Sequence, residues 1–271
     1  MVKARKRFGQ HFLTDTEVLS RITSAVSITA GDAVLEIGPG RGALTEYLHA
    51  AAQDLHAIEL DRDLVPLLRA RYPDLTLTEG DVLSEAFDGA LAAREGWRLV
   101  GNLPYNISSP FMLRLAELTR AKPELIRDGH FMVQREMALR MAAEPGTKAW
   151  GRLSVMLQLH FAIEILFDVP PETFDPPPKV DSSVLRMQPL PKLELSSEHF
   201  GMLDSILKTA FAARRKRLAN ALKRFDVPWA ETEVDADLRA DQVDAASYVK
   251  LTQVLYDQQI AGENDVSPAK H

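Results

Sequence analysis

Ala33-Val34-Leu35-Glu36-Ile37-Gly38-Pro39-Gly40-Arg41-Gly42 is a short apolar run that ends in a glycine-rich turn. A helical pattern follows from about Ala43, so the stretch predicts a strand, a tight turn and a helix. Such a unit opens the doubly wound sheets that bind ligands at the carboxyl ends of their parallel strands. We therefore predict an α/β fold with a Rossmann-like sheet.

The glycine turn alone fits two kinds of cofactor. Gly38, Gly40 and Ala43 match the G-x-G-x-x-A spacing of dinucleotide-binding proteins. Glu36 beside the turn disfavours an anionic pyrophosphate and suits S-adenosylmethionine, which carries a sulfonium and an ammonium group. The next predicted strand ends in Glu59, where a carboxylate can accept hydrogen bonds from both ribose hydroxyls. Because these two acids make the cleft acidic, we expect S-adenosylmethionine there and not NAD.

Polar residues also follow the third and fourth predicted strands. Asp81 comes after the strand 75–78, and its carboxylate suits either the amine of a cofactor adenine or a helix N-cap. Asn102 ends the fourth apolar run. Since the carboxyl ends of parallel strands meet at one edge of a sheet, we expect these side chains to lie together. Asp61 and Asp63 are expected to be exposed.

The stretch Gly101-Asn102-Leu103-Pro104-Tyr105 has the groups needed to hold a nucleobase. Pro104 keeps Leu103 extended and lacks a backbone donor, which leaves carbonyl groups free to point outward. The Asn102 side-chain oxygen, the Leu103 carbonyl and the Tyr105 ring together suit a flipped-out base whose exocyclic amine needs two acceptors. A plain strand-to-loop turn is the alternative, because Asn and Pro are common turn residues.

Two later loops carry aromatic residues. Phe174-Asp175-Pro176-Pro177-Pro178-Lys179-Val180-Asp181-Ser182-Ser183 is stiffened by its prolines and precedes the predicted strand 184–187. We expect Phe174 to sandwich the flipped base against Tyr105. The polar loop 143–152 carries Trp150, which is expected to be exposed in a surface loop or in a flap over nucleic acid.

The remaining patterns predict a mixed chain that becomes helical after Pro189-Leu190-Pro191. Thr14 and Glu17 have the spacing of a capping box, which predicts a helix start there. The other predicted elements are strands at 130–134 and 161–169, helices at 110–119, 135–142 and 153–159, an apolar helical stripe from Phe200 to Phe211, and a final helix around 249–255.

The composition is that of an ordinary globular protein. A chain of 271 residues with 46% hydrophobic residues is long enough for one large domain and a small one. No segment has the apolar length of a membrane span or the pattern of a signal peptide, so we expect a cytoplasmic protein without a membrane partner. With no cysteine and no HExxH-like histidine spacing, we expect no metal site.

The net charge of −6 argues against a protein that coats nucleic acid indiscriminately. Two basic clusters nevertheless suit phosphate contacts. A solvated arm and a charged helix face are the alternative interpretation. The clusters are Lys3, Arg5, Lys6 and Arg7 near the N-terminus, and Arg214, Arg215, Lys216 and Arg217, followed by Lys223 and Arg224.

Four motifs in this order resemble one family, the KsgA-type (RsmA-type) small-subunit ribosomal RNA adenine dimethyltransferases. They are Val34–Gly40, Asn102–Tyr105, Gly151-Arg152-Leu153-Ser154 and Phe174–Ser182, and the resemblance extends from Arg5 to about Leu222. It implies a Rossmann-like class I methyltransferase domain with a small C-terminal helical domain. It also implies an enzyme that uses S-adenosylmethionine to dimethylate N6 of two adjacent adenines in the 3'-terminal hairpin loop of small-subunit (16S) rRNA.

The resemblance assigns roles to residues of this chain. The implied cofactor-binding residues are His11 and Leu13 on the methionine side, Gly38 in the glycine turn, Glu59 at the ribose, Asp81 at the adenine, and Asn102. The implied catalytic residues are Asn102, Leu103, Pro104, Tyr105 and Phe174. Position 11 is Asn or His in the family, and Trp150 stands where Tyr is expected. A basic helix is implied at 210–222.

The implied organisation has three parts: a methyltransferase domain with a basic N-terminal arm (1–189), a helical domain (190–262) and a disordered tail (263–271). The implied partner is small-subunit rRNA within an assembling ribosomal subunit, and we expect the protein to be a monomer.

Two other functions stay open at this point. A resistance-type methyltransferase acting on large-subunit rRNA adenine shares the fold and catalytic motif, but the Phe8–Leu13 and Gly151–Ser154 signatures favour the small-subunit enzyme. A non-catalytic RNA or transcription scaffold of the same fold is the second alternative. Intact Glu59, Asp81 and Asn102–Tyr105 argue against such a scaffold.

Overall fold

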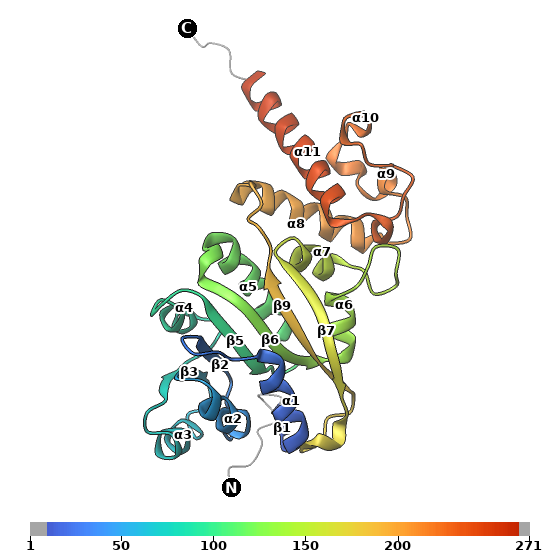
Figure 1. The fold of residues 1–271 in the computed structure, drawn as a ribbon. Coiled ribbons are helices and arrows are strands. Elements are labelled where there is room, and N and C mark those ends of the chain that lie inside the picture. The colour runs from blue at the N-terminus through green and yellow to red at the C-terminus, as the bar shows by residue number, and fades with distance from the viewer. Residues whose placement is uncertain (1–9, 266–271) are drawn as a thin grey trace. The chain divides into compact units, whose positions relative to one another are not determined.

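The computed structural model describes residues 10–265, which form two compact units (Figure 1). The first unit comprises the chain up to Ala142 together with His160–Lys192, and the second comprises Ala143–Leu159 and the chain from Leu193. The N-terminal basic cluster and the beginning of the Phe8–Leu13 signature lie outside the described residues. Within residues 10–265, no helix is long and apolar enough to cross a membrane.

A seven-stranded sheet forms the centre of the first unit, in the order β4-β3-β2-β5-β6-β9-β7. The pairs among β2 to β6 are parallel, whereas β9 runs antiparallel between β6 and β7. The predicted α/β fold with a Rossmann-like sheet is thereby confirmed. The strands are β2 (Ala33–Ile37), β3 (Asp54–Glu59), β4 (Thr76–Glu79), β5 (Trp97–Asn102), β6 (Ile126–Gln134), β7 (Phe161–Val169) and β9 (Ser182–Pro189).

The order of the strands in the sheet reverses at β2: β3 and β4 follow it on one side, and β5 and β6 follow it on the other. Its neighbours are β3 on one side and β5 on the other, so a crevice opens at its carboxyl end. All five residues of β2 are buried, as expected for a parallel strand covered on both faces. Gly101 on β5 allows the close approach, since a Cβ there would lie 2.7 Å from the Ile37 carbonyl oxygen.

Helices alternate with the parallel strands, as the sequence patterns predict. They are α1 (Thr16–Val26), α2 (Ala43–Ala51), α3 (Val65–Arg71), α4 (Glu85–Leu91), α5 (Ser108–Ala121) and α6 (Arg135–Met141), with short 3-10 turns η2 (Pro123–Leu125) and η3 (Pro171–Thr173). The predicted capping box at Thr14 and Glu17 is wrong. Asp15 is the N-cap of α1 and accepts from the N–H groups of Glu17 and Val18, while the Thr14 hydroxyl donates to the Thr173 carbonyl.

A second, two-stranded sheet joins distant parts of the first unit. Strand β1 (Phe12–Leu13) pairs antiparallel with β8 (Phe174–Asp175), and Leu13 lies opposite Phe174. The pairing brings the N-terminal segment against the proline-rich loop. This contact fixes both segments at the edge of the large sheet where the carboxyl ends of the parallel strands meet.

The second unit is helical and has its own core. Its elements are α7 (Arg152–Gln158), α8 (Ser197–Ala212), α9 (Leu218–Ala221), η4 (Lys223–Phe225), α10 (Trp229–Thr232), η5 (Ala240–Gln242) and α11 (Ala245–Asp265). Residues 143–159, which the sequence analysis placed in the first domain, belong here because α7 packs against α8 and α11. Helix α11 also includes residues 263–265, which were assigned to a disordered tail; residues 266–271 lie outside the described part.

Two expectations about the second unit are wrong. Trp150 is not exposed: only 1% of its surface is accessible, and its indole N–H donates to the Val243 carbonyl. A continuous basic helix over 210–222 does not form, because α8 ends at Ala212 and α9 begins at Leu218. Arg214 to Arg217 of the second basic cluster therefore lie in the turn between α8 and α9, and Lys223 and Arg224 lie in η4.

A buried charge network links the amino ends of the central strands in the first unit. Arg98 donates to both carboxylate oxygens of Asp128 and to Asp32, and the three side chains are all less than 10% exposed. Arg98 also donates to the Ser27 carbonyl at the end of α1. This arginine therefore neutralises two buried carboxylates and satisfies a helix terminus.

Replacing Arg98 by Ala should lower the free energy of unfolding by about 3 to 5 kcal/mol, because it leaves the buried Asp128 without its arginine and Asp32 with only the exposed Arg127. Urea denaturation of the full chain measures this effect. Arg127→Ala is the matched control: Arg127 also pairs with Asp32 but is largely exposed, so its loss should cost less than about 1 kcal/mol. Equal effects of the two substitutions would contradict this account.

Candidate functional site

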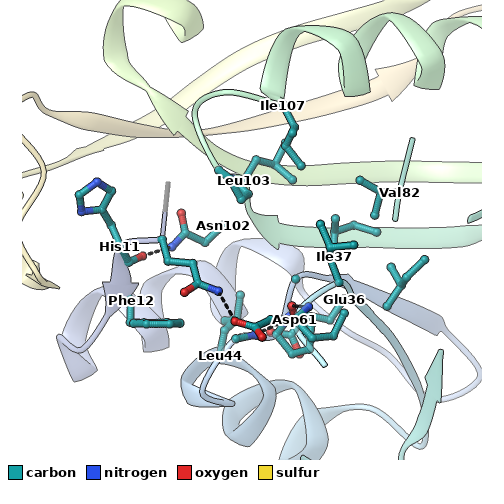
Figure 2. A pocket seen from close by; sticks show the side chains of 18 of the residues that line it. His11, Phe12, Glu36, Ile37, Leu44, Asp61, Val82, Asn102, Leu103 and Ile107 are labelled. Carbon is teal, nitrogen blue, oxygen red and sulfur yellow. Dashed lines mark hydrogen bonds between the residues drawn. The ribbon is translucent and has the colours of Figure 1, made fainter. Parts of the chain in front are cut away.

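A cavity opens in the first unit at the carboxyl ends of β2, β3, β4 and β5 (Figure 2). It receives side chains from the glycine turn, from the ends of these strands and from the N-terminal segment. The predicted positions that line it are His11, Leu13, Glu36, Gly38, Glu59, Asp81, Asn102, Leu103, Pro104 and Tyr105. Phe174 is the one predicted site residue that does not line it. The structure thus gathers these positions, while their roles remain predictions.

The glycine turn exposes its backbone to the cavity. Gly38 and Gly40 have φ angles of +67° and +60°, which L-residues with side chains rarely adopt. A Cβ on Gly38 would meet no atom within 4 Å, so a side chain there would project into the cavity. A ligand can consequently approach the main chain at Gly38 more closely than at any residue with a side chain.

Glu59 connects the glycine turn to the end of β3. Its Oε2 accepts from the Gly40 N–H at 2.9 Å, and its Oε1 accepts from the Asp61 N–H at 2.8 Å. Burial raises the pKa of this carboxyl, and the backbone hydrogen bonds oppose that rise. Each oxygen keeps a further lone pair, so the carboxylate can still accept from the hydroxyls of a ligand.

Asp61 is not exposed as expected. Only 1% of its surface is accessible, and its Oδ2 accepts from the Gln10 side-chain amide at 3.0 Å (Figure 2). Asp63, in contrast, is exposed as predicted. The contact with Gln10 explains the difference, because it covers Asp61 with a segment fifty-one residues away in the chain.

Glu36 is buried at the floor of the cavity and is 1% exposed. Burial raises its pKa to about 8; the Thr45 hydroxyl opposes this rise and the charge of Glu59 adds to it. Burial therefore favours the neutral form of Glu36, which counts against the expectation that this acid makes the cleft negative. Its Oε2 forms no hydrogen bond with any described residue. Such an orphaned atom beside the cavity fits a cofactor that carries an ammonium group.

Asp81 is held at the end of β4 by the chain that follows. Its Oδ1 accepts from the Leu83 N–H at 2.8 Å, and no described residue donates to Oδ2. The N-cap of the next helix is Ser84 and not Asp81. Oδ2 is thus available to a ligand amine, as the sequence analysis predicted for a cofactor adenine.

Asn102 has a defined amide orientation. Its Nδ2 donates to the His11 carbonyl at 3.0 Å, and Figure 2 shows the amide oxygen turned away from His11. The Leu103 N–H donates to the Met132 carbonyl, which continues the pattern of the sheet by one residue. Within residues 10–265 no donor reaches the Asn102 side-chain oxygen or the Leu103 carbonyl, so both oxygens can still accept a hydrogen bond.

Tyr105 is held at both its ring and its hydroxyl. The His11 imidazole stacks on the ring, with centroids 5.6 Å apart and planes 27° apart. The His11 Nδ1 donates to the Pro176 carbonyl at 2.8 Å, and the Tyr105 hydroxyl is hydrogen-bonded to Ser182 Oγ at 3.0 Å. None of these three contacts was predicted. Residues 11, 176 and 182 come together with residue 105 only through the β1–β8 pairing and through β9.

Phe174 does not sandwich a base against Tyr105 in this structure. It is 4% exposed and packs in the core of the first unit with Leu13, its partner across β1 and β8. The aromatic ring that faces Tyr105 is that of His11. The sequence signal for a fixed aromatic residue was sound, since the loop does immobilise Phe174, but it could not reveal to which side the ring turns.

Comparisons with known proteins agree on one family. Residues 1–257 match the family described as ribosomal RNA adenine dimethylase. The chain is 46% identical over 256 residues to ribosomal RNA small subunit methyltransferase A of Dechloromonas aromatica, covering 93% of this chain and 98% of that protein.

Two solved structures have a similar fold. A dimethyladenosine transferase from Plasmodium falciparum has a TM-score of 0.77 and 25% sequence identity, over 92% of this chain and 98% of the other. The 23S rRNA methyltransferase ErmE has a TM-score of 0.67 and 25% identity, over 90% of this chain and 99% of the other.

Glu36→Gln should stabilise the cofactor-free protein increasingly as pH rises. The folded pKa of about 8 lies above the ordinary value of 4.5. The contribution of Glu36 to the unfolding free energy of the wild type is therefore fully present below pH 4.5 and is lost as pH rises towards 8. The difference in unfolding free energy should grow by about 1.4 kcal/mol per pH unit in this window. Urea denaturation at several pH values tests it, and a difference that does not vary with pH would contradict the assignment.

Proposed function

The chain belongs to the ribosomal RNA adenine dimethylase family, and from this premise we propose that it methylates N6 of two adjacent adenines in the 3'-terminal hairpin loop of 16S rRNA. The proposed cofactor is S-adenosylmethionine, and the proposed substrate is the RNA within an assembling small subunit in the cytoplasm. The observation that carries the proposal is the Asn102 amide, which donates to the His11 carbonyl through Nδ2 and lines the same cavity as the candidate cofactor residues.

The cofactor residues divide into three groups by chemistry. Glu59 would accept from the ribose hydroxyls and Asp81 from the adenine amine. Glu36, the Gly38 backbone and the N-terminal residues His11 and Leu13 would enclose the methionine part. S-adenosylmethionine, when bound, supplies a methyl group on a positively charged sulfonium. A positive ligand would also favour ionisation of Glu36, because an opposite charge nearby lowers the pKa of a carboxyl.

The target adenine must leave its stack before it can reach the cavity. Unstacking costs a few kcal/mol, and the cost is lowest for a base in an unpaired loop. Stacking on the Tyr105 ring would return about 1 to 3 kcal/mol. Because the His11 imidazole already covers one face of that ring, the base would either use the remaining face or displace the imidazole.

The two acceptors at the edge of β5 would then orient the amine. N6 of adenine has two hydrogens, one for the Asn102 side-chain oxygen and one for the Leu103 carbonyl. Two hydrogen bonds from the amine to these acceptors would draw the nitrogen towards a tetrahedral geometry. Its lone pair would then be free to attack the methyl carbon. The chain needs no strong general base, because the nitrogen becomes acidic only as its bond to the methyl carbon forms and the bond from that carbon to sulfur breaks. The nitrogen would then lose its proton to solvent, and alignment supplies most of the acceleration.

A second transfer to the same nitrogen is chemically possible because one hydrogen remains after the first. The singly methylated amine would rotate so that this hydrogen meets one of the two acceptors. The small-subunit assignment is favoured over the large-subunit one by similarity: 46% identity to a small-subunit methyltransferase, against 25% to ErmE.

Asn102→Ala should reduce single-turnover methyl transfer to undermethylated small subunits by about 100-fold, because the amine loses one of its two orienting contacts. Transfer of a labelled methyl group, with the modified nucleotides mapped, measures rate and product together. Binding of the subunit and of S-adenosylmethionine, measured in parallel, should change much less. A wild-type rate in the variant, or a product methylated on a ring nitrogen or a ribose, would refute the proposed function.

The basic side chains of the second cluster differ in whether they have an acidic partner. Arg214 pairs with Asp241 and donates to the Thr147 carbonyl, and Arg217 pairs with Asp237. Arg215 and Lys216 are exposed and have no acidic partner among the described residues. These two side chains are therefore the best candidates for contacts with RNA phosphates, whereas neutralising Arg214 or Arg217 would also disturb the unit itself.

Changing Arg215 and Lys216 together to Gln should weaken small-subunit binding and make it less dependent on salt, since fewer counterions are released. The slope of log K against log salt should fall by about 1.5, while cofactor affinity stays unchanged. The matched control changes Arg69 and Lys122, which are exposed in the first unit, to Gln. Equal effects of the two pairs would show that only total charge matters.

A further inference from the structure

The Tyr105 hydroxyl has no part in the proposed stacking, because a phenylalanine ring would offer the same surface to a base. Its oxygen nevertheless lies 3.0 Å from Ser182 Oγ, across seventy-seven residues of chain. The hydroxyl is kept protonated, since burial raises its pKa. A polar group retained on a stacking ring requires an explanation, and its partner Ser182 belongs to the proline-rich motif without a role so far.

We propose that Ser182 is a positioning residue that holds the Tyr105 ring at the angle required to stack the target adenine. This inference rests on the proposed function, because it assumes that the base stacks on Tyr105. Ser182 itself touches neither cofactor nor base in this scheme. It acts through the Tyr105 hydroxyl alone.

Ser182 is suited to this role because its backbone is fixed on both sides. It is the first residue of β9 and lies opposite Gln134 of β6 and Val169 of β7. Its side chain is 1% exposed, so water does not compete for the hydroxyl. A hydrogen-bonding group on the central strand of three is among the least mobile in the unit.

Tyr105 needs such an anchor because its own backbone is less constrained. It lies in the connection between β5 and α5, and its side chain is only partly buried. The stack on His11 limits the tilt of the ring but leaves it free to slide within its plane. A bond at the far end of the ring removes that freedom, since any swing about the side-chain torsions moves the hydroxyl furthest.

The next residue in the strand supplies a matched control. Ser183 is also buried, and its hydroxyl donates to Asp168 on β7 at 2.6 Å. Successive residues of a strand point to opposite faces of the sheet, so Ser183 does not approach Tyr105. Ser183→Ala removes a buried serine hydroxyl from the same strand without touching the proposed anchor.

The test is a double-mutant cycle on single-turnover methyl transfer at saturating small subunits and S-adenosylmethionine. Ser182→Ala and Tyr105→Phe each remove the bond from one side, and each should slow transfer about two- to tenfold, the usual effect of one neutral hydrogen bond. The double variant should be no slower than either single one. Cofactor affinity should not change, Ser183→Ala should transfer at the wild-type rate, and Ser182→Thr, which keeps the hydroxyl, should restore the rate.

Wild-type rates in both single variants, or effects that multiply in the double variant, would overturn the proposal. If Ser182→Ala lowers the melting temperature too far to be assayed, Tyr105→Phe decides the question, because it removes the same hydrogen bond, keeps the ring and changes a side chain that is only partly buried. Tyr105→Ala separates the two ideas. A slow Tyr105→Ala with a normal Tyr105→Phe overturns only the role of Ser182, whereas a normal Tyr105→Ala overturns the proposed stacking itself.

Discussion

The chemistry proposed for the cavity depends on one contact, the hydrogen bond from the Asn102 amide to the His11 carbonyl. An amide can present either a donor or an acceptor, and only the acceptor suits an amine. The His11 carbonyl is in place because β1 pairs with β8, and β8 is in place because the loop after it enters β9. One orientation of one side chain thus depends on segments from both ends of the first unit.

The same arrangement explains which parts of the site the sequence predicted. Four predicted positions lie at or within two residues of the carboxyl end of a parallel strand: Glu36, Glu59, Asp81 and Asn102. The carboxyl ends of parallel strands in one sheet meet whatever the remaining chain does. Asp61 and Phe174 depend instead on which distant segment covers them. Local patterns contain no information on that, so Asp61 was wrongly expected to be exposed, and Phe174, expected beside Tyr105, lies in the core. The contacts of His11 and Ser182 with Tyr105 were missed for the same reason.

Charge in the cavity also follows from burial more than from composition. Counting acids predicts a negative cleft, yet burial raises the pKa of Glu36 to about 8, and no described residue donates to its Oε2. Burial also raises the pKa of Glu59, but there backbone N–H groups oppose the rise. Two glutamates that look equivalent in the sequence therefore differ in their hydrogen bonding.

The assignment of residues 143–159 to the second unit affects how the protein is made. Trp150 and Val155 belong to a core completed by Leu207, Leu251 and other residues that are synthesised much later. At ordinary rates of translation, this apolar segment stays without its partners for on the order of ten seconds after it is made. The first unit cannot simply be released as a finished domain, since its strand β7 begins where that waiting segment ends. The segment 143–159 therefore completes its core only after the chain as far as Leu251 has been made.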